Sequence, residues 1–222
     1  MLDGHSPVPV QLPLMPKPRD HHVVDRVGLV RLARIFSNVV SPPVMFAVLG
    51  LALALRAKPL WPALGWAAVY GFFVSLGPIL FVLYLLRTGR IMELHMSDTR
   101  ERHLPYVVAA LGSLIVVALL LALKGPKLLV CLALFNLLTL YTIGVVNTRW
   151  LISFHAAAAM AMDTIVALVF GPAAGLALSP VVGLVFVVRL YLRRHTASQV
   201  MAGLVVGAFS VLVLRGVGCF VL

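Results

Sequence analysis

The chain has 222 residues, of which 62% are hydrophobic and only 11% carry a formal charge. An average soluble domain is roughly 45–50% apolar and about 25% charged, whereas the mean hydropathy of this chain is +1.06. These values exclude a disordered chain, a coiled coil and a disulfide scaffold, and they leave little room for a soluble domain. We therefore expect an all-α protein that crosses the membrane several times.

The N-terminal part of the chain differs from the rest. The first 22 residues are rich in Pro and His and contain no apolar segment, which is not the pattern of a signal peptide. We expect a mobile tail over residues 1–22 and a single membrane domain over residues 23–222. Residues 25–38 mix Val, Leu and Ile with three arginines, a spacing that predicts a helix lying in the membrane interface.

Apolar runs follow one another from residue 42 to the end of the chain. Each is close to the length of about 20 residues that a helix needs to cross a bilayer. Because the ends of the first and fifth runs are not sharply marked, we expect a bundle of about six to seven transmembrane helices. The runs cover residues 42–55, 60–86, 106–123, 128–146, 151–170, 176–190 and 200–222.

The formal net charge of +11 would suggest a nucleic-acid partner in a soluble protein. Here the cations lie in short loops between apolar runs, so we expect contacts with lipid or an anionic substrate and no nucleic acid. The tail and the loops 87–105, 147–155 and 189–199 fall on one side of the membrane, which we call the basic face. It holds 13 Lys and Arg against 5 on the other side. The positive-inside rule places it in the cytoplasm, and we expect the cell membrane. The 13 cations are Lys17, Arg19, Arg26, Arg31, Arg34, Arg87, Arg90, Arg100, Arg102, Arg149, Arg189, Arg193 and Arg194.

Several chemistries are disfavoured by the residues present. Cys131 and Cys219 lie inside apolar runs, so we interpret them as packing residues and not as a disulfide or zinc ligands. The 7 Asp and Glu residues form no pair that could hold Mg²⁺ on a span, which argues against a prenyltransferase. No nucleophile elbow of a Ser-His-Asp hydrolase is present. We therefore expect neither a metal nor another cofactor.

Arginine and histidine in all three loops of the basic face predict a site for a phosphate ester. Arginines neutralise the oxygens of the transition state. One histidine attacks phosphorus and another protonates the leaving alkoxide. Thr196 and Ser198 are capping candidates for the last helix, whose N-terminus favours an anion.

Three short motifs carry a resemblance to a known family. Arg189 and His195, six residues apart, match Ser-Arg-x5-His-x3-Asp, and Ser153 and His155 match Pro-Ser-Gly-His. Residues 98–105 match Lys-x6-Arg-Pro only at the proline. These are the third, second and first signatures of the type 2 phosphatidic acid phosphatase superfamily. The chain resembles this family over residues 98–207 as a divergent member.

The resemblance implies a fold with a six-helix core and the metal-independent hydrolysis of a lipid phosphate through a phosphohistidine. His195 would be the nucleophile, His155 the general acid, and Arg189 and Ser153 would bind the phosphate. Arg100 and Arg102 would replace the missing Lys and Arg of the first signature, which is our hypothesis.

The chain departs from the family pattern at several positions. Gln199 stands where the family has the Asp that orients the nucleophile. At i+4 it still faces His195, but it brings no negative charge. Phe154 replaces a glycine and crowds the phosphate pocket. Two spans separate the first and second signatures.

Three functions remain open. The first is hydrolysis of phosphatidic acid, phosphatidylglycerophosphate or a polyprenyl phosphate or diphosphate, entering sideways from the bilayer. The second is a catalytically inactive lipid-phosphate-binding protein of the same fold. The third is a small anionic-lipid transporter. Two further features favour packing roles. Gly203-x3-Gly207 and Gly171-x3-Gly175 permit close helix approach, and we expect Asp163 on the fifth run either to be protonated or to bond a neighbouring helix, such as the fourth run at Asn136.

Overall fold

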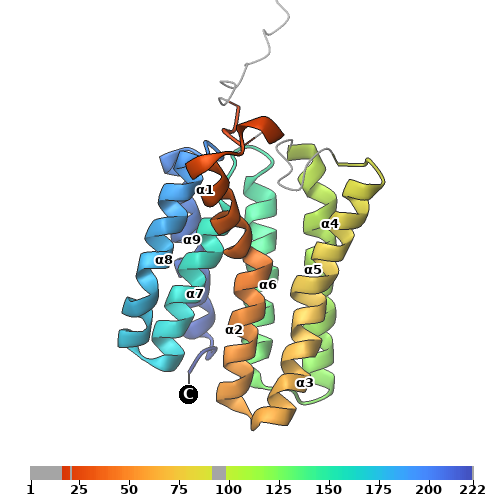
Figure 1. Ribbon diagram of the computed structural model, residues 1–222. Coiled ribbons are helices and arrows are strands. Elements are labelled where there is room, and N and C mark those ends of the chain that lie inside the picture. Colours follow the sequence, from red (N-terminus) through yellow and green to blue (C-terminus); the bar gives the residue numbers. More distant parts are fainter. Residues whose placement is uncertain (1–16, 21, 92–98, 222) are drawn as a thin grey trace, which may run out of the picture.

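The computed structural model describes residues 17–20, 22–91 and 99–221, without the side chains of residues 23 and 99–102. Every regular element in these ranges is a helix, which confirms the predicted all-α bundle (Figure 1). In chain order the elements are η1 (Val23–Asp25), α1 (Gly28–Val39), α2 (Pro42–Ala57), α3 (Leu60–Gly71), η2 (Phe72–Leu76), α4 (Gly77–Arg87), α5 (Thr99–Ala122), α6 (Lys127–Val146), α7 (Phe154–Phe170), α8 (Pro172–Tyr191) and α9 (Ala197–Gly216).

Each of the seven predicted apolar runs contains a helix. Among the described residues, 5 helices are long and apolar enough to cross a membrane: the continuous α3–η2–α4, then α5, α6, α8 and α9. α1 and α2, bent by 44° at their junction, make a sixth if they form one span. α7 is apolar but has only 17 residues. The chain is thus an integral membrane protein with a span count near the predicted range.

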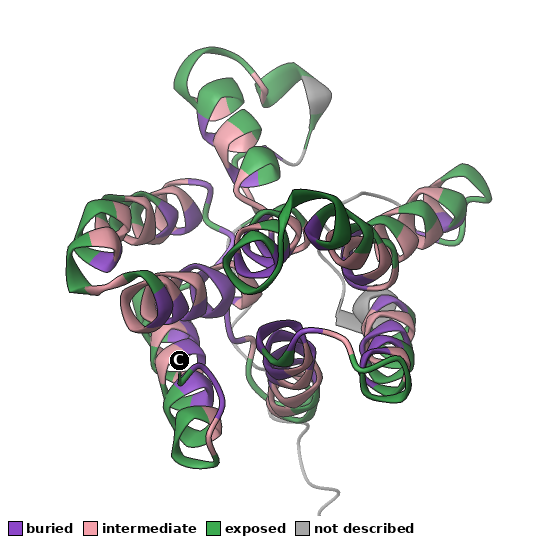
Figure 2. Ribbon diagram, turned by 90° about the horizontal axis from the view of Figure 1, so that it is seen from below, coloured by how far each residue is buried: buried purple, intermediate pink, exposed green. Residues whose placement is uncertain are grey.

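The connections between the helices lie at the two ends of the bundle (Figure 1). α1, the C-terminal end of α4 and the segments that precede α7 and α9 lie at one end, which is the basic face (Figure 1). The C-terminus and the turns that follow α2, α5 and α7 lie at the other end. Viewed along the helices, buried residues occupy the inward faces and exposed residues the outward faces (Figure 2).

Two glycines of α9 allow it to touch the backbone of α7. A Cβ atom added at Gly203 would overlap the carbonyl oxygen of Ser153, and one added at Gly207 would overlap that of Ala157. Ala156 and Ala157, which contact these glycines, are fully buried. The predicted close approach at Gly203-x3-Gly207 is confirmed, and it draws the first turns of α7 and α9 together.

The two glycines of the pair Gly171-x3-Gly175 have different roles. A Cβ atom at Gly175 would lie 2.6 Å from the side chain of Ala167, so this glycine packs α8 against α7. Gly171 instead has a φ of +104°, a left-handed conformation that favours glycine in the turn between the two helices.

The interpretation of the cysteines as separate packing residues is wrong. Cys131 in the second turn of α6 and Cys219 after α9 form a disulfide, with Cα atoms 5.5 Å apart. Both are buried. Spacing along the sequence could not reveal this pair, because 88 residues separate the two cysteines and only the packing of α6 beside α9 brings them together.

α1 confirms the amphipathic helix expected over residues 25–38, although it begins three residues later. It buries Ala33 and Ser37, four residues apart, against the bundle. Its opposite side carries a stripe of exposed apolar side chains, as a helix in the membrane interface would. These are Leu32, Ile35 and Val39.

Candidate functional site

Ser37 on α1 links two of the predicted site residues. Its hydroxyl accepts a hydrogen bond of 3.1 Å from Nη1 of Arg189, in the last turn of α8. Its backbone carbonyl oxygen lies 3.2 Å from Nε2 of His155, the second residue of α7. Because a carbonyl oxygen only accepts, Nε2 carries the proton in this contact. The predicted phosphate clamp and the predicted general acid therefore meet at one residue that sequence reasoning did not select.

His195 lies in the turn before α9 and is only 6% exposed. The next residue, Thr196, is the N-cap of α9, which confirms it as the capping residue. Its hydroxyl accepts a hydrogen bond from the N–H of Gln199 at 3.4 Å, and Oε1 of Gln199 accepts one from the N–H of Thr196 at 3.0 Å. This capping box fixes the main chain that carries His195.

Gln199 therefore has a described role that differs from the expected one. We expected its side chain to orient the ring of His195, and its oxygen instead binds the backbone one residue further along. A direct action of Gln199 on the imidazole stays a prediction.

Ser153 is fully buried and is the N-cap of α7. Its hydroxyl accepts a hydrogen bond of 3.4 Å from the N–H of Ala156, and its own N–H donates one of 3.2 Å to the carbonyl oxygen of Gln199. A serine hydroxyl that accepts can still donate its own proton. The N-termini of α7 and α9 thus lie side by side, and both contribute partial positive charge that favours an anion.

A carboxylate from the N-terminal segment lies buried in this basic face. Asp20 is fully buried. Its Oδ1 accepts a hydrogen bond of 3.0 Å from Nε of Arg194 and forms an ion pair with Nη2 of the same side chain at 2.9 Å, and its Oδ2 accepts a hydrogen bond of 3.1 Å from Nη1 of Arg34. Arg194, one of the cations of the basic face, is itself only 5% exposed. Because Asp20 and Arg194 are both buried, removing one of them would leave the other as a buried charge without a counter-charge, which is strongly destabilising.

The residues next to Asp20 are also held in place. The N–H of Arg19 donates to the carbonyl oxygen of Leu192 at 3.1 Å, and its guanidinium lies 4.6 Å from the ring centre of Tyr191. Nε of Arg26 donates to the carbonyl oxygen of Asp20 at 3.0 Å. The prediction of a mobile tail over residues 1–22 is therefore wrong for Arg19 and Asp20, because their polar groups find buried partners at the end of α8. Residues 1–16 and 21 lie outside the described residues.

Arg100 and Arg102 fall in the first turn of α5. Their side chains lie outside the described residues, as do Ser97 and Asp98 of the proposed first signature. Whether they complete the site therefore stays a hypothesis.

The amino-acid sequence alone did not lead us to select Ser37 or Asp20, or to predict that Arg34 binds a buried carboxylate. One signal for Ser37 was available: with Ala33 it forms an i, i+4 pair of small residues opposite the apolar stripe of α1, and such a pair marks the side of a helix that packs. Asp20 offered no comparable signal, because it lies 174 residues from its partner Arg194.

The gathered groups suit a bound oxyanion. The guanidinium groups of Arg34 and Arg194 share the carboxylate of Asp20, and that of Arg189 binds Ser37, which lies on α1 as Arg34 does. The N-termini of α7 and α9 lie at the same end of the bundle (Figure 1). Among the described residues, no three His, Cys, Asp or Glu side chains are grouped to hold a metal ion. No family model, curated protein or solved structure matches the chain.

Proposed function

We propose that the protein hydrolyses a lipid phosphate at the basic face through a phosphohistidine, without a metal. One observation carries the proposal: Ser37 joins Arg189 and His155 at the end of the bundle where His195 is buried. The carboxylate of Asp20, held by Arg34 and Arg194, supports it further, because a carboxylate and a phosphate present similar oxygens to a guanidinium.

In the first step a ring nitrogen of His195 attacks phosphorus, and a P–N bond forms as the ester P–O bond breaks. His155 gives a proton to the leaving alkoxide of the lipid. Arg189 neutralises the charge that develops on the phosphoryl oxygens, which is the largest contribution expected of such a site.

In the second step His155, now without that proton, accepts one from a water molecule. The water oxygen attacks phosphorus, the P–N bond breaks and inorganic phosphate leaves. Gln199 contributes no negative charge to the imidazole, so we expect slow turnover. In serine proteases, replacing the orienting Asp by Asn costs about 10⁴ in turnover.

Phosphate release in detergent with EDTA present tests the proposal. The purified protein is offered phosphatidic acid, phosphatidylglycerophosphate, and polyprenyl mono- and diphosphates. We expect release from at least one of them, with a loss of about 10³-fold or more in His195→Ala and about 10²-fold in Arg189→Ala.

Arg56→Ala is the matched control for Arg189→Ala. Arg56 also lies in the last turn of a helix, α2, but at the opposite end of the bundle, so this variant keeps full activity. A phosphoprotein trapped with labelled substrate should be stable in base, labile in acid and missing from His195→Ala. Release that is unchanged in His195→Ala would contradict the mechanism.

A catalytically inactive lipid-phosphate-binding protein is the second candidate. Two contacts favour it. Arg194 already forms an ion pair with Asp20, and the side-chain oxygen of Gln199 accepts a hydrogen bond in the cap of α9. This candidate predicts no phosphate release by folded protein, but retention of the same lipids, with affinity reduced in Arg189→Ala.

We further propose that the basic face is cytoplasmic and that the membrane is the cell membrane. The excess of cations supports this orientation, and so does the disulfide at the other end of the bundle, because disulfides persist in oxidising compartments. A membrane-impermeant maleimide should label Lys58→Cys in intact cells and Thr88→Cys only after lysis. The reverse pattern would overturn the orientation.

A further inference from the structure

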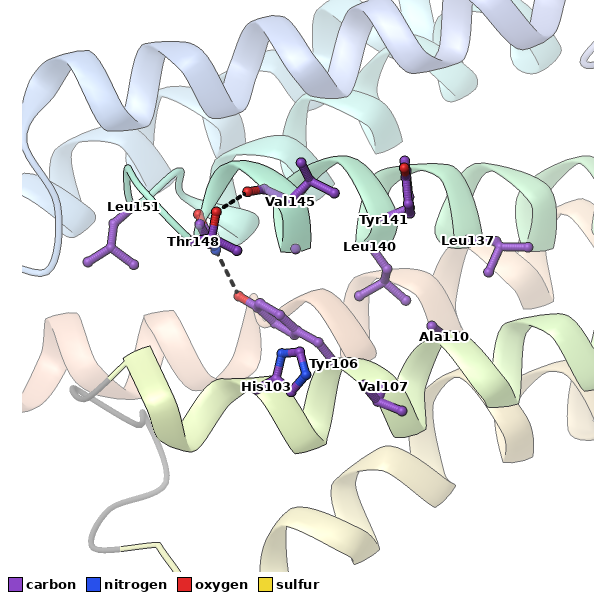
Figure 3. A pocket seen from close by; sticks show the side chains of 12 residues that line it. His103, Tyr106, Val107, Ala110, Leu137, Leu140, Tyr141, Val145, Thr148 and Leu151 are labelled. Atoms are coloured by element: carbon purple, nitrogen blue, oxygen red, sulfur yellow. Dashed lines mark hydrogen bonds between the residues drawn. The ribbon is translucent and has the colours of Figure 1, made fainter.

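A groove of about 540 Å³ runs along the outside of the bundle between α5 and α6. Tyr106, Val107 and Ala110 line it from α5, and residues of α6 line the facing wall (Figure 3). Its size lies within the range of small-molecule and lipid sites. The groove lies outside the cluster around Ser37.

The lining changes character along the groove (Figure 3). His103, Tyr106, Asn147 and Thr148 lie at the end nearest the basic face, and Nδ2 of Asn147 donates to the hydroxyl of Tyr106 at 3.4 Å. The rest of the lining is almost entirely apolar down to Leu137. An occupant that matches this lining has a polar head and a hydrocarbon tail.

The groove opens toward the bilayer and not toward water. Its walls belong to two helices that are long and apolar enough to span the membrane. The lining residues Tyr141 and Val145 are 71% and 54% exposed, so the groove is open on the outer surface of these two helices. A Cβ atom added at Gly144 would meet nothing within 4 Å, so this glycine leaves part of the groove empty.

Two contacts join the polar end of the groove to the start of α7. The ring of Tyr106 packs edge-on against the ring of Phe154, with centroids 6.3 Å apart. Oδ1 of Asn147 accepts a hydrogen bond of 2.7 Å from the N–H of Ile152. Ile152 and Phe154 flank Ser153, and Phe154 directly precedes His155. The polar end of the groove therefore adjoins the start of α7, which carries Ser153 and His155.

We propose that this groove binds the hydrocarbon tail of the anionic lipid whose phosphate is bound at the basic face. The inference rests on the proposed function and adds to it the place of the tail, on the hairpin of α5 and α6. Because lipid and groove are equally apolar, tail binding is selected by shape and not by hydrophobic gain. Filling the groove should therefore exclude long chains and leave short ones unaffected.

Photocrosslinking tests the location. The probe is a phosphatidic acid that carries a diazirine near the end of one acyl chain, added to the purified protein in detergent. We expect crosslinks to residues of α5 and α6 that line the groove, such as Val107, Ala110 and Leu137, and their loss in Gly144→Trp. Gly183→Trp is the matched control, because a Cβ added at Gly183 on α8 likewise meets nothing within 4 Å, and it should keep the crosslinks.

Kinetics separates this inference from the proposed function. In Gly144→Trp the ratio of kcat/KM for long-chain over dibutyryl phosphatidic acid should fall about tenfold or more, since a misfit of one methylene already costs about that much. Activity that is unchanged in Gly144→Trp, with crosslinks elsewhere, overturns the groove and leaves the phosphatase intact. Crosslinks in the groove without phosphate release would instead overturn the phosphatase and support lipid binding alone.

Discussion

The two sides of the bundle solve the same packing problem in different ways. α7, α8 and α9, with α1 above them, use alanine and glycine to bring backbones into contact, and they bury polar groups in paired arrangements. α5 and α6 leave between them a groove that is lined mostly by apolar side chains. The first region can hold groups in a fixed geometry, as catalysis requires. The second leaves space for a flexible chain, as lipid binding requires.

The largest effect expected in the tightly packed region is that of Asp20→Ala. This change leaves the buried Arg194 and the half-buried Arg34 without their carboxylate, at a cost of about 3–5 kcal/mol. Hydrogen exchange should show faster exchange over residues 17–40 and in the turn before α9. Asp25→Ala, a change at an exposed carboxylate in the same segment, is the control and should leave exchange unchanged. Equal protection in both variants would mean that the ion pair does not hold the segment.

The disulfide connects the two regions, because Cys131 belongs to α6 and Cys219 follows α9. Cys219→Ala should lower the free energy of unfolding by about 2–4 kcal/mol, measured by thermal unfolding in detergent. Cys131→Ala should have the same effect, and the double variant should add little to either. Additive losses would indicate that the two cysteines contribute separately, by packing alone.

Glycine substitutions compare the regions directly. Gly207→Leu forces α9 away from the backbone of Ala157 and should cost about 1–3 kcal/mol. Gly216→Leu on the same helix, where an added Cβ meets nothing within 4 Å, is the control for the change in helix propensity. Gly144→Leu on α6 should behave like Gly216→Leu in thermal unfolding. A loss in Gly144→Leu as large as that in Gly207→Leu would remove the proposed contrast.

The smallest effect expected is that of the cap before α9. Thr196→Ala removes one hydrogen bond of the capping box and should cost about 1 kcal/mol of stability. Because this cap fixes the main chain of His195, phosphate release should fall more than stability alone explains. Thr196→Ser keeps the hydroxyl and should restore both. Failure of serine to restore activity would indicate that the methyl group of Thr196 matters instead.

The amino-acid sequence by itself determined the class of protein and the order of its helices. Apolar runs of the length of a bilayer can only be satisfied as helices, so every predicted run contains one. Local signals also sufficed for Thr196 as a cap, since it binds a residue three positions away. The spacing of Gly203 and Gly207 showed that α9 could approach another helix closely, but it did not show that this helix is α7. The roles of His195, His155 and Arg189 stay predictions, carried by the spacing of the motifs.

Only the tertiary structure decided which distant residues meet. Ser37 joins Arg189 across 152 residues, Asp20 reaches Arg194 across 174, and Cys131 reaches Cys219 across 88. The groove likewise depends on how α5 packs against α6, and neither helix would form it alone. Sequence periodicity records which side of a helix is apolar, but the choice of partner depends on shape and pairing across the whole bundle. That physical difference explains why the tail was expected to be mobile, although its carboxylate lies buried among arginines.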